Sequence, residues 1–305
     1  MSCEIEHKGT FNTLLNINKI KKNLTRRIMI DKIATMIFFG STLFALLVLG
    51  ILIYRIFTQS IGWLDLQFLT STLSIFPEKA GILGAIIGSF LLMIIVAPVT
   101  IVLGVATAIY LEEYASKSKF QSFVKMNISN LAGVPSVIFG LLGLTVFGRL
   151  LNLGSSILAG GLTMSLLVLP IVVVAAQEAV RAVPGFLRDA SYAMGASRWT
   201  TIRKVVLPVA LPGILTGSIL ALSRAIGETA PLVVLGIPAL ILRIPTGFMD
   251  NFTALPIQIY YWTLDAVLTR EYANLAAATI VALMVMLAMM NSIAIIIRNK
   301  FQKRY

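Results

Sequence analysis

The stretch DASYAMGASRWTTIRKVVLP, residues 189–208, is a short polar segment between two long apolar runs. It predicts two short helices joined at Gly195, because a left-handed residue often ends a helix and glycine adopts that conformation without strain. Pro184 suits the start of the first helix, where its missing N–H would lack a partner anyway, and Ser197 can cap the second. Pro208 marks the join to the next apolar run, because a proline deep inside a helix removes a hydrogen bond. Five cations surround this polar segment: Arg181, Arg188, Arg198, Arg203 and Lys204.

The overall composition excludes a soluble globular protein. Of the 305 residues, 58% are hydrophobic and 12% are charged, whereas about a quarter of the residues in a soluble domain are charged. The net charge of +12 would suit nucleic acid, but the cations lie in short stretches between apolar runs, as the positive-inside rule describes. We therefore expect the chain to contact membrane lipid and no nucleic acid.

The cysteine and histidine inventory excludes several kinds of site. The sequence has one cysteine, Cys3, and one histidine, His7, both in the N-terminal tail. A disulfide within the chain and a Cys/His metal cluster are therefore impossible. A zinc protease motif and a histidine-assisted catalytic triad are excluded for the same reason. We expect no metal site and no catalytic residue.

Six apolar runs predict an all-α membrane protein with six transmembrane helices. The first run is free of charge for 22 residues, about the length needed to cross roughly 30 Å of hydrocarbon. It is too long for a signal peptide, so we expect a retained anchor after a basic tail at residues 1–32. Residues 33–305 are expected to form one membrane domain with a cytoplasmic loop at 177–206. The spans are predicted at about 33–54, 81–111, 131–148, 157–176, 207–232 and 272–297.

The distribution of cations predicts the orientation of the chain. Six spans place both termini on one side, together with the loop between the second and third spans and the polar segment. Nineteen cations lie on that side and four on the other. Because cytoplasmic loops carry the excess of Lys and Arg, both termini and the polar segment are predicted to be cytoplasmic.

The fifth span contains two opposite charges, in the stretch SRAIGETAPL at residues 223–232. Arg224 and Glu228 lie four residues apart, so on a helix they share one face and can pair. A charge at the centre of a membrane costs about 2.5–3.5 kcal/mol on insertion scales, and such residues usually face a bundle interior or a watery path. Two interpretations stay open: a structural ion pair that fixes helix packing, or a contact point for an anion on a translocation path.

In the second interpretation, the Arg224 guanidinium attracts an oxyanion through its planar fork of parallel donors. Glu228 either holds Arg224 in place or accepts a proton from a protonated phosphate oxygen. The second role would reject fully deprotonated sulfate. The expected substrate pathway comprises Arg224, Glu228 and the adjoining Thr229.

The polar segment resembles the cytoplasmic "EAA" loop of ABC importer permeases. That loop has an acidic–Ala–small triplet, then a glycine after three residues, then aliphatic-x-Leu-Pro after nine more. The triplet here has Asp for the commoner Glu and Ser for the second Ala, which keeps the charge and the small size. The resemblance implies that residues 186–194 are a coupling helix that sits in a groove on an ATPase subunit. The residues that match the loop are Asp189, Ala190, Ser191, Gly195, Leu207 and Pro208.

A second resemblance concerns the substrate. SRAIGETAPL is similar to the fifth-helix segment of the PstA-type permeases of phosphate ABC importers, and YLEEYA at residues 110–115 is also similar to that family. The companion PstC-type subunit typically has Met-Ala where this chain has Ala230-Pro231. The resemblance covers roughly residues 81–297. It implies a MetI-like permease fold in a bacterial or archaeal cytoplasmic membrane. It also implies a PstC-type permease partner, a PstB-type ATPase dimer and a PstS-type extracytoplasmic phosphate-binding protein.

The sequence contains no ATP-binding motif of its own. A P-loop needs a Gly-Lys pair, and no glycine here is followed by lysine. ATP and Mg²⁺ are therefore expected on the partner ATPase, with no cofactor in this chain. Alternatives are a permease for another oxyanion such as sulfate or molybdate, or the PstC-type subunit itself. This sequence lacks the histidines, cysteines and GxSxG motif that an intramembrane enzyme would need. A passive channel would not need an ATPase-docking loop.

Overall fold

The computed structural model describes residues 17–115, 118–238, 240–241 and 243–301. Cys3, His7 and the first half of the basic tail lie outside the described residues. The described residues form helices joined by turns. An isolated β-bridge pairs Ser156 with Asn251. The prediction of an all-helical chain is confirmed for this part of the sequence.

Five described helical stretches are long and apolar enough to cross a membrane. They are Arg26–Ser60, Leu83–Tyr114, Ile157–Arg181, Arg198–Ile226 and Glu271–Lys300. The pair Lys119–Leu131 and Ser136–Leu150 passes the same test jointly, with a bend of 104° between its halves. The described chain therefore has five candidate spans, or six if the bent pair is one span.

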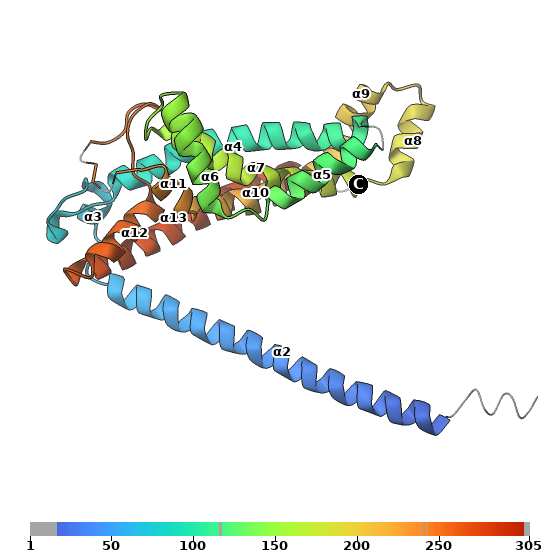
Figure 1. Ribbon diagram of the computed structural model, residues 1–305, viewed down its shortest axis with the longest axis horizontal. Coiled ribbons are helices and arrows are strands. Elements are labelled where there is room, and N and C mark those ends of the chain that lie inside the picture. The colour runs from blue at the N-terminus through green and yellow to red at the C-terminus, as the bar shows by residue number, and fades with distance from the viewer. Residues whose placement is uncertain (1–16, 116–117, 239, 242, 302–305) are drawn as a thin grey trace, which may run out of the picture. The chain divides into compact units, whose positions relative to one another are not determined.

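The chain divides into two units, residues 1–55 and 56–305. In the first, α2 (Ile17–Ser60) is one continuous helix that carries the apolar run from Ile33 to Tyr54 and extends past Arg55 into the second unit (Figure 1). The second unit holds the remaining helices and both hydrophobic clusters of its core. Its longer helices are α4 (Leu83–Ile109), α5 (Lys119–Leu131), α7 (Ile157–Arg181), α10 (Leu207–Ile226), α12 (Leu255–Asp265) and α13 (Glu271–Phe301). Its short elements are α3 (Leu66–Thr70), η1 (Pro77–Lys79), η2 (Tyr110–Tyr114), α6 (Ser136–Leu142), η3 (Gly143–Leu150), α8 (Gly185–Ala193), α9 (Arg198–Thr201), η4 (Ile202–Val206) and α11 (Ala230–Val234).

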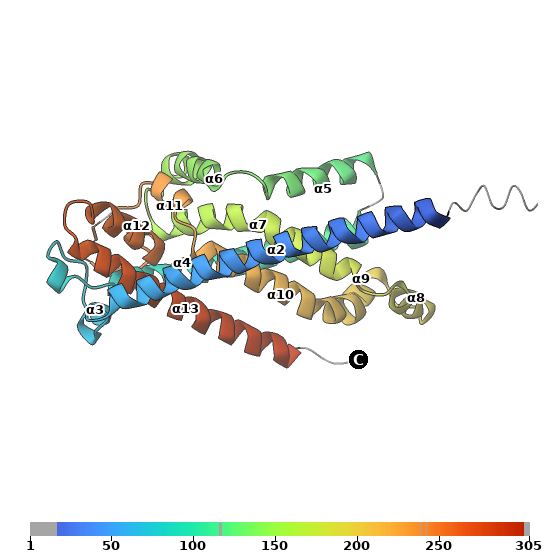
Figure 2. The ribbon, with the colours of Figure 1, turned by 90° about the horizontal axis from the view of Figure 1, so that it is seen from below.

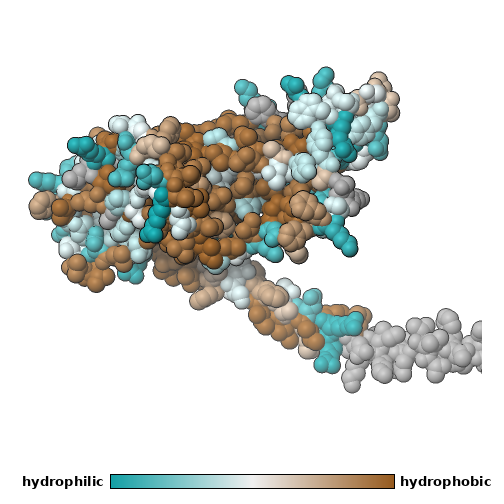
Figure 3. Space-filling model, turned by 45° about the horizontal axis from the view of Figure 1, so that its top comes forward, coloured by the Kyte–Doolittle hydropathy of each residue, from teal (hydrophilic) through white to brown (hydrophobic). Residues whose placement is uncertain are grey.

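Helices α4, α7 and α10 lie side by side and form the framework of this unit (Figure 2). Small residues allow the close contact between α4 and α7: a Cβ added at Gly104 would lie 2.7 Å from Cγ1 of Val172, and one at Gly161 would lie 2.8 Å from Cγ2 of Ile95. Phe252, from the segment between α11 and α12, is fully buried against Gly160 of α7. Apolar side chains gather across the middle of the unit and hydrophilic ones at its two ends (Figure 3).

We expect Gly104→Ala to lower the free energy of unfolding by about 1–3 kcal/mol, because overpacking a close contact costs about that much. Gly84→Ala is the matched control in the same helix, since a Cβ at Gly84 meets nothing within 4 Å. The thermal unfolding midpoint of the purified chain in detergent measures both effects. Equal midpoints for the two variants would contradict the close approach of α4 and α7.

Two predicted spans differ from the observed helices. The run at 207–232 is interrupted: α10 ends at Ile226, Gly227 caps it, and Ala230 starts α11 with Pro231 in its first turn. The run at 131–148 does not begin a helix, because Pro135 precedes α6 and disfavours helical backbone at Val134. Helix α5 ends instead at Leu131, and the chain bends before Ser136.

The segment between α11 and α12 is hydrogen-bonded to the first turn of α7. The N–H groups of Ile157 and Leu158 donate to the carbonyls of Asp250 and Phe248, at 3.1 and 2.9 Å. The Asp250 carboxylate accepts from the N–H groups of Thr246 and Gly247 at 2.9 and 2.8 Å and from the Thr246 hydroxyl at 3.1 Å. These hydrogen bonds lower the pKa of Asp250, with the Thr246 N–H as the largest cause. The segment is thus held in place by its own turn and by α7.

Candidate functional site

The polar segment has the helix–glycine–helix structure that its sequence predicts. Helix α8 ends at Ala193, and Gly195 adopts a left-handed conformation with φ of 78°. The N–H of Gly195 donates to the carbonyl of Tyr192 at 2.9 Å, which closes the end of the helix. Ser197 then caps α9, its hydroxyl accepting from the N–H of Thr200 at 3.3 Å. Both helices lie at one end of the second unit (Figure 1).

The six residues predicted to couple with an ATPase fall into two groups. Asp189, Ala190 and Gly195 are exposed on the outer surface of this turn. The Ser191 hydroxyl is instead 2.9 Å from that of Thr201, so it joins α8 to α9 within the chain. Leu207 and Pro208 are half-buried in the first turn of α10, where Leu207 packs against the smaller hydrophobic cluster.

Sequence reasoning missed four large side chains that are exposed on α8, on α9 and in the turn between them. They are Phe186 (68% exposed), Tyr192 (41%), Met194 (88%) and Trp199 (58%). Apolar side chains exposed together beside charged ones often mark a protein interaction site. A signal for them was present in the sequence, since large apolar and aromatic residues are interspersed among the polar ones there.

Arg224 and Glu228 come together at the far end of α10. Arg224 lies in the last turn of that helix, and Glu228 lies in the break that follows Gly227. Nε of Arg224 is 3.5 Å from Oε1 of Glu228, so the predicted pair forms even though the two residues do not share one continuous helix. The side chain of Arg224 is 66% exposed and that of Glu228 is 21% exposed.

Both residues line a cavity of about 360 Å³. Its other walls are the bend at residues 131–136 and apolar side chains of α7 and α10, including Leu167, Val168, Ile171 and Ala221. Thr229, the third predicted pathway residue, does not line it. Its carbonyl accepts from the N–H groups of Leu232 and Val233, both at 3.1 Å, so Thr229 is the N-cap residue of α11.

The guanidinium of Arg224 has spare hydrogen-bonding capacity. Arginine carries five N–H donors, and Glu228 is the one partner that the described residues give it. An uncommitted guanidinium on an otherwise mostly apolar cavity wall can bind an oxyanion bidentately. The ion pair is therefore not closed on itself, because donors of the guanidinium remain uncommitted among the described residues.

The end of α4 is a further site, for which the sequence indicated a family resemblance but no role. Residues 110–115 read YLEEYA, and in the structure η2 continues α4 through Tyr110–Tyr114 as a wide turn. Its two glutamates make ion pairs with Lys125 of α5, Arg181 of α7 and Arg188 of α8. Nothing in the sequence indicated these partners, because they are far apart along the chain.

Comparison with known proteins identifies the family. Residues 100–305 match the family described as "Binding-protein-dependent transport system inner membrane component". The chain is 36% identical over 204 residues to the probable ABC transporter permease protein YqgI of Bacillus subtilis, covering 67% of this chain and 69% of that protein. It is 35% identical over 243 residues to the phosphate transport system permease protein PstA 1 of Mycobacterium tuberculosis H37Rv, covering 78% of this chain and 77% of that protein.

A further relative and a solved structure agree. The phosphate transport system permease protein PstA of Yersinia pestis is 32% identical over 257 residues, covering 84% of this chain and 79% of that protein. A chain of the MetNI methionine ABC transporter in an inward-facing conformation matches with a TM-score of 0.56 at 18% identity, covering 73% of this chain and 96% of that one. This likeness confirms the predicted MetI-like fold. The chain belongs to the binding-protein-dependent transport system inner membrane components, and is a multi-pass ABC transporter permease subunit of the inner membrane and not an enzyme.

Proposed function

We propose that this chain is the PstA-type permease subunit of an ATP-driven importer of inorganic phosphate. The observation that carries the proposal is the Arg224–Glu228 pair on the wall of the 360 Å³ cavity. Relatives named as phosphate transport system permeases support the choice of substrate. The partners would be a PstC-type permease subunit, a PstB-type ATPase dimer that binds ATP and Mg²⁺, and a PstS-type protein that delivers phosphate outside.

The two charged residues would divide the recognition of phosphate between them. The Arg224 guanidinium would bind phosphate oxygens, while Glu228 holds its Nε edge at 3.5 Å and leaves the other donors available. The Glu228 carboxylate would also accept a hydrogen bond or proton from a protonated phosphate oxygen. Sulfate at neutral pH has no such proton, so the same carboxylate would repel it.

The exposure of Arg224 supports a permease partner. A guanidinium that is 66% exposed at the end of a span is costly against lipid, and such groups usually face a protein interior or a watery path. We propose that the PstC-type subunit covers this side of the cavity and completes the path. The two subunits together would then enclose the transported anion.

The polar segment would receive the mechanical work. Exposed residues of α8 and α9 would dock on the ATPase, and α9, η4 and α10 form one helical stretch, Arg198–Ile226, that reaches Arg224. A displacement at the docked end could therefore be carried to the cavity. The excess of cations supports a cytoplasmic location for this end and for both termini.

The test is uptake of labelled phosphate by vesicles that contain the whole complex. We expect ATP-dependent uptake that excess unlabelled phosphate abolishes and that equal concentrations of sulfate or molybdate leave unchanged. Preferential uptake of sulfate or molybdate would assign the chain to another oxyanion importer. Uptake that persists without the ATPase subunit would indicate a passive channel and would contradict the proposal.

A further inference from the structure

Three consecutive side chains at the end of α4 contact four other helices of the second unit. Glu112, Glu113 and Tyr114 all lie in η2. Glu112 pairs with α5 and α7, Glu113 pairs with α8, and the ring of Tyr114 lies 5.5 Å from the guanidinium carbon of Arg198 in α9. The two helices of the polar segment are thus both attached to the end of one transmembrane helix.

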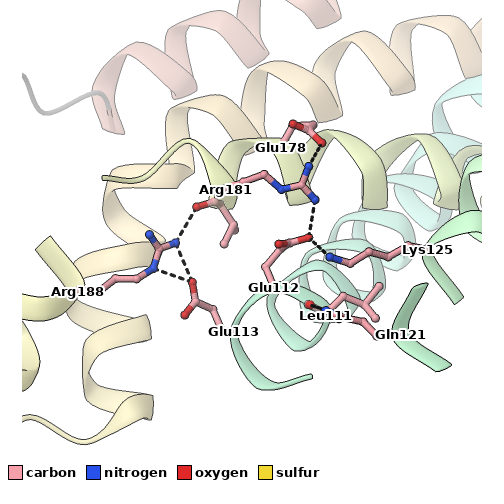
Figure 4. Close-up of polar contacts among 9 residues, drawn as sticks. Leu111, Glu112, Glu113, Gln121, Lys125, Glu178, Arg181 and Arg188 are labelled. Carbon is pink, nitrogen blue, oxygen red and sulfur yellow. Dashed lines mark hydrogen bonds and ion pairs between the residues drawn. The ribbon is translucent and has the colours of Figure 1, made fainter. Parts of the chain in front are cut away.

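The contact between Glu113 and Arg188 is the most enclosed of these. Nε and Nη2 of Arg188 donate to Oε1 of Glu113 at 3.1 and 2.9 Å (Figure 4). The Glu113 side chain is 7% exposed and that of Arg188 is 21% exposed. Water therefore screens this pair much less than it screens an ordinary surface ion pair.

Arg188 also binds the end of α7. Its Nη1 donates to the carbonyl of Val183 at 2.6 Å, and its Nη2 to the carbonyl of Val180 at 2.9 Å. Carbonyls at the end of a helix lack partners within the helix, and a cation there is favourable. One guanidinium therefore joins α8 to the ends of both α4 and α7.

Glu112 has the same chemistry but different partners. It accepts from Nζ of Lys125 at 2.7 Å and from Nη2 of Arg181 at 3.0 Å. These contacts brace α4 against α5 and α7, and neither partner belongs to α8 or α9. The side chain of Glu112 is 13% exposed. Adjacent glutamates of similar burial thus serve two different connections.

We propose that Glu113 is a positioning residue for coupled transport, which transmits displacement of α8 directly to α4 through Arg188. This inference rests on the proposed function, because it takes α8 as the docking element. It gives a second route from α8 to the cavity, in addition to the helical stretch Arg198–Ile226. An ion pair with two hydrogen bonds and little solvent exposure resists separation, because separating the two charges leaves each of them buried without a partner.

The second route ends at the same cavity as the first. Helix α4 packs along α7 through Gly104 and Gly161. Leu167, Val168 and Ile171 of α7 line the cavity that holds Arg224. Displacement of α4 and α7 would therefore move the part of the cavity wall that α7 forms, in addition to the part that α10 forms.

The experiment compares Glu113→Gln with its neighbour Glu112→Gln in the whole complex in vesicles. The readout is the amount of phosphate transported per ATP hydrolysed, together with the amount of ATPase that co-purifies. We expect Glu113→Gln to retain the ATPase and its hydrolysis, and to transport about tenfold less phosphate per ATP, within the usual range of coupling between sites. Glu112→Gln is expected to stay within about twofold of wild type, because its ion pairs do not reach α8 or α9.

A double substitution tests the ion pair itself. If Glu113 acts through Arg188, Glu113→Gln combined with Arg188→Gln should lower the phosphate-to-ATP ratio no further than the larger single effect. Equal phosphate-to-ATP ratios for the Glu113 and Glu112 variants would overturn this inference. The proposed function would still stand if the wild-type complex transports phosphate. Loss of the ATPase from the Glu113→Gln complex would make Glu113 an assembly residue and would also overturn it. Absence of phosphate transport by the wild-type complex would refute the proposed function and this inference with it.

Discussion

Replacing Arg224 with Gln should lower ATP-driven phosphate uptake by about 100-fold, because losing one partner of a charge contact that the PstC-type subunit would enclose costs several kcal/mol. Gln keeps hydrogen-bonding groups and much of the side-chain length, but it loses the charge and the fork that suits an oxyanion. It also leaves Glu228 without its partner at 3.5 Å, so the cavity wall becomes net negative and repels the substrate. The measurement is labelled phosphate uptake at equal amounts of assembled complex.

Arg149→Gln is the matched control for Arg224→Gln. Arg149 is an exposed cation near the end of η3 and does not line the cavity, so its loss should leave uptake unchanged. Arg224→Lys separates charge from geometry, because lysine keeps the charge but not the fork, and it should give an intermediate rate. Wild-type uptake by an assembled Arg224→Gln complex would show that this residue is not on the path.

The second large effect is expected at Gly195, where Gly195→Val should lower coupled transport about tenfold. A non-glycine residue in the left-handed region costs roughly 1–2 kcal/mol, and β-branched residues fit it worst. Gly195 has φ of 78°, and an added Cβ would meet nothing within 4 Å. The penalty therefore comes from the backbone turn between α8 and α9, which must distort and shift the docking surface.

Two other variants isolate that backbone effect. Gly195→Asn should retain most transport, because asparagine tolerates the left-handed conformation. Gly185→Ala places a methyl in equally open space at the start of α8, where no left-handed conformation is needed. Co-purification of the ATPase and transport are measured for all three variants. Full assembly and full transport by Gly195→Val would refute the predicted role of this turn.

The sequence predicted the polar segment well because its structure is decided by local chemistry. Gly195 ends α8 and Ser197 caps α9, and both act within four residues of their own position. The apolar runs were also easy to recognise, because each needs only length and hydrophobicity. These features do not depend on what the rest of the chain does.

Helix ends inside apolar runs were predicted poorly, because a span predicted from the length of an apolar run takes no account of local helix breaks. The run at 207–232 is apolar before and after the break, yet Gly227 caps α10 and α11 begins at Ala230 with Pro231 in its first turn. The bend before α6 has a similar origin at Pro135. Glycine and proline indicated a helix break in both places, but the spans were predicted from the length of each apolar run.

The contacts of Glu112 and Glu113 could not be predicted from the sequence. Arg181 and Arg188 lie 69 and 75 residues away from them, and the polar segment offers several other cations. Only the packing of α4 on α7 decides which cation meets which carboxylate. Arg224 and Glu228 were easier to pair because they lie four residues apart.

The most direct test of the account measures ATP hydrolysis and phosphate uptake in the same vesicles, for the wild-type complex and for Arg224→Gln. If work enters at α8 and the anion is contacted at Arg224, a change at Arg224 should affect phosphate uptake without affecting ATP hydrolysis. We predict that the wild type couples them, whereas Arg224→Gln continues to hydrolyse ATP and takes up almost no phosphate. Equal phosphate uptake per ATP hydrolysed in the two samples would contradict the account.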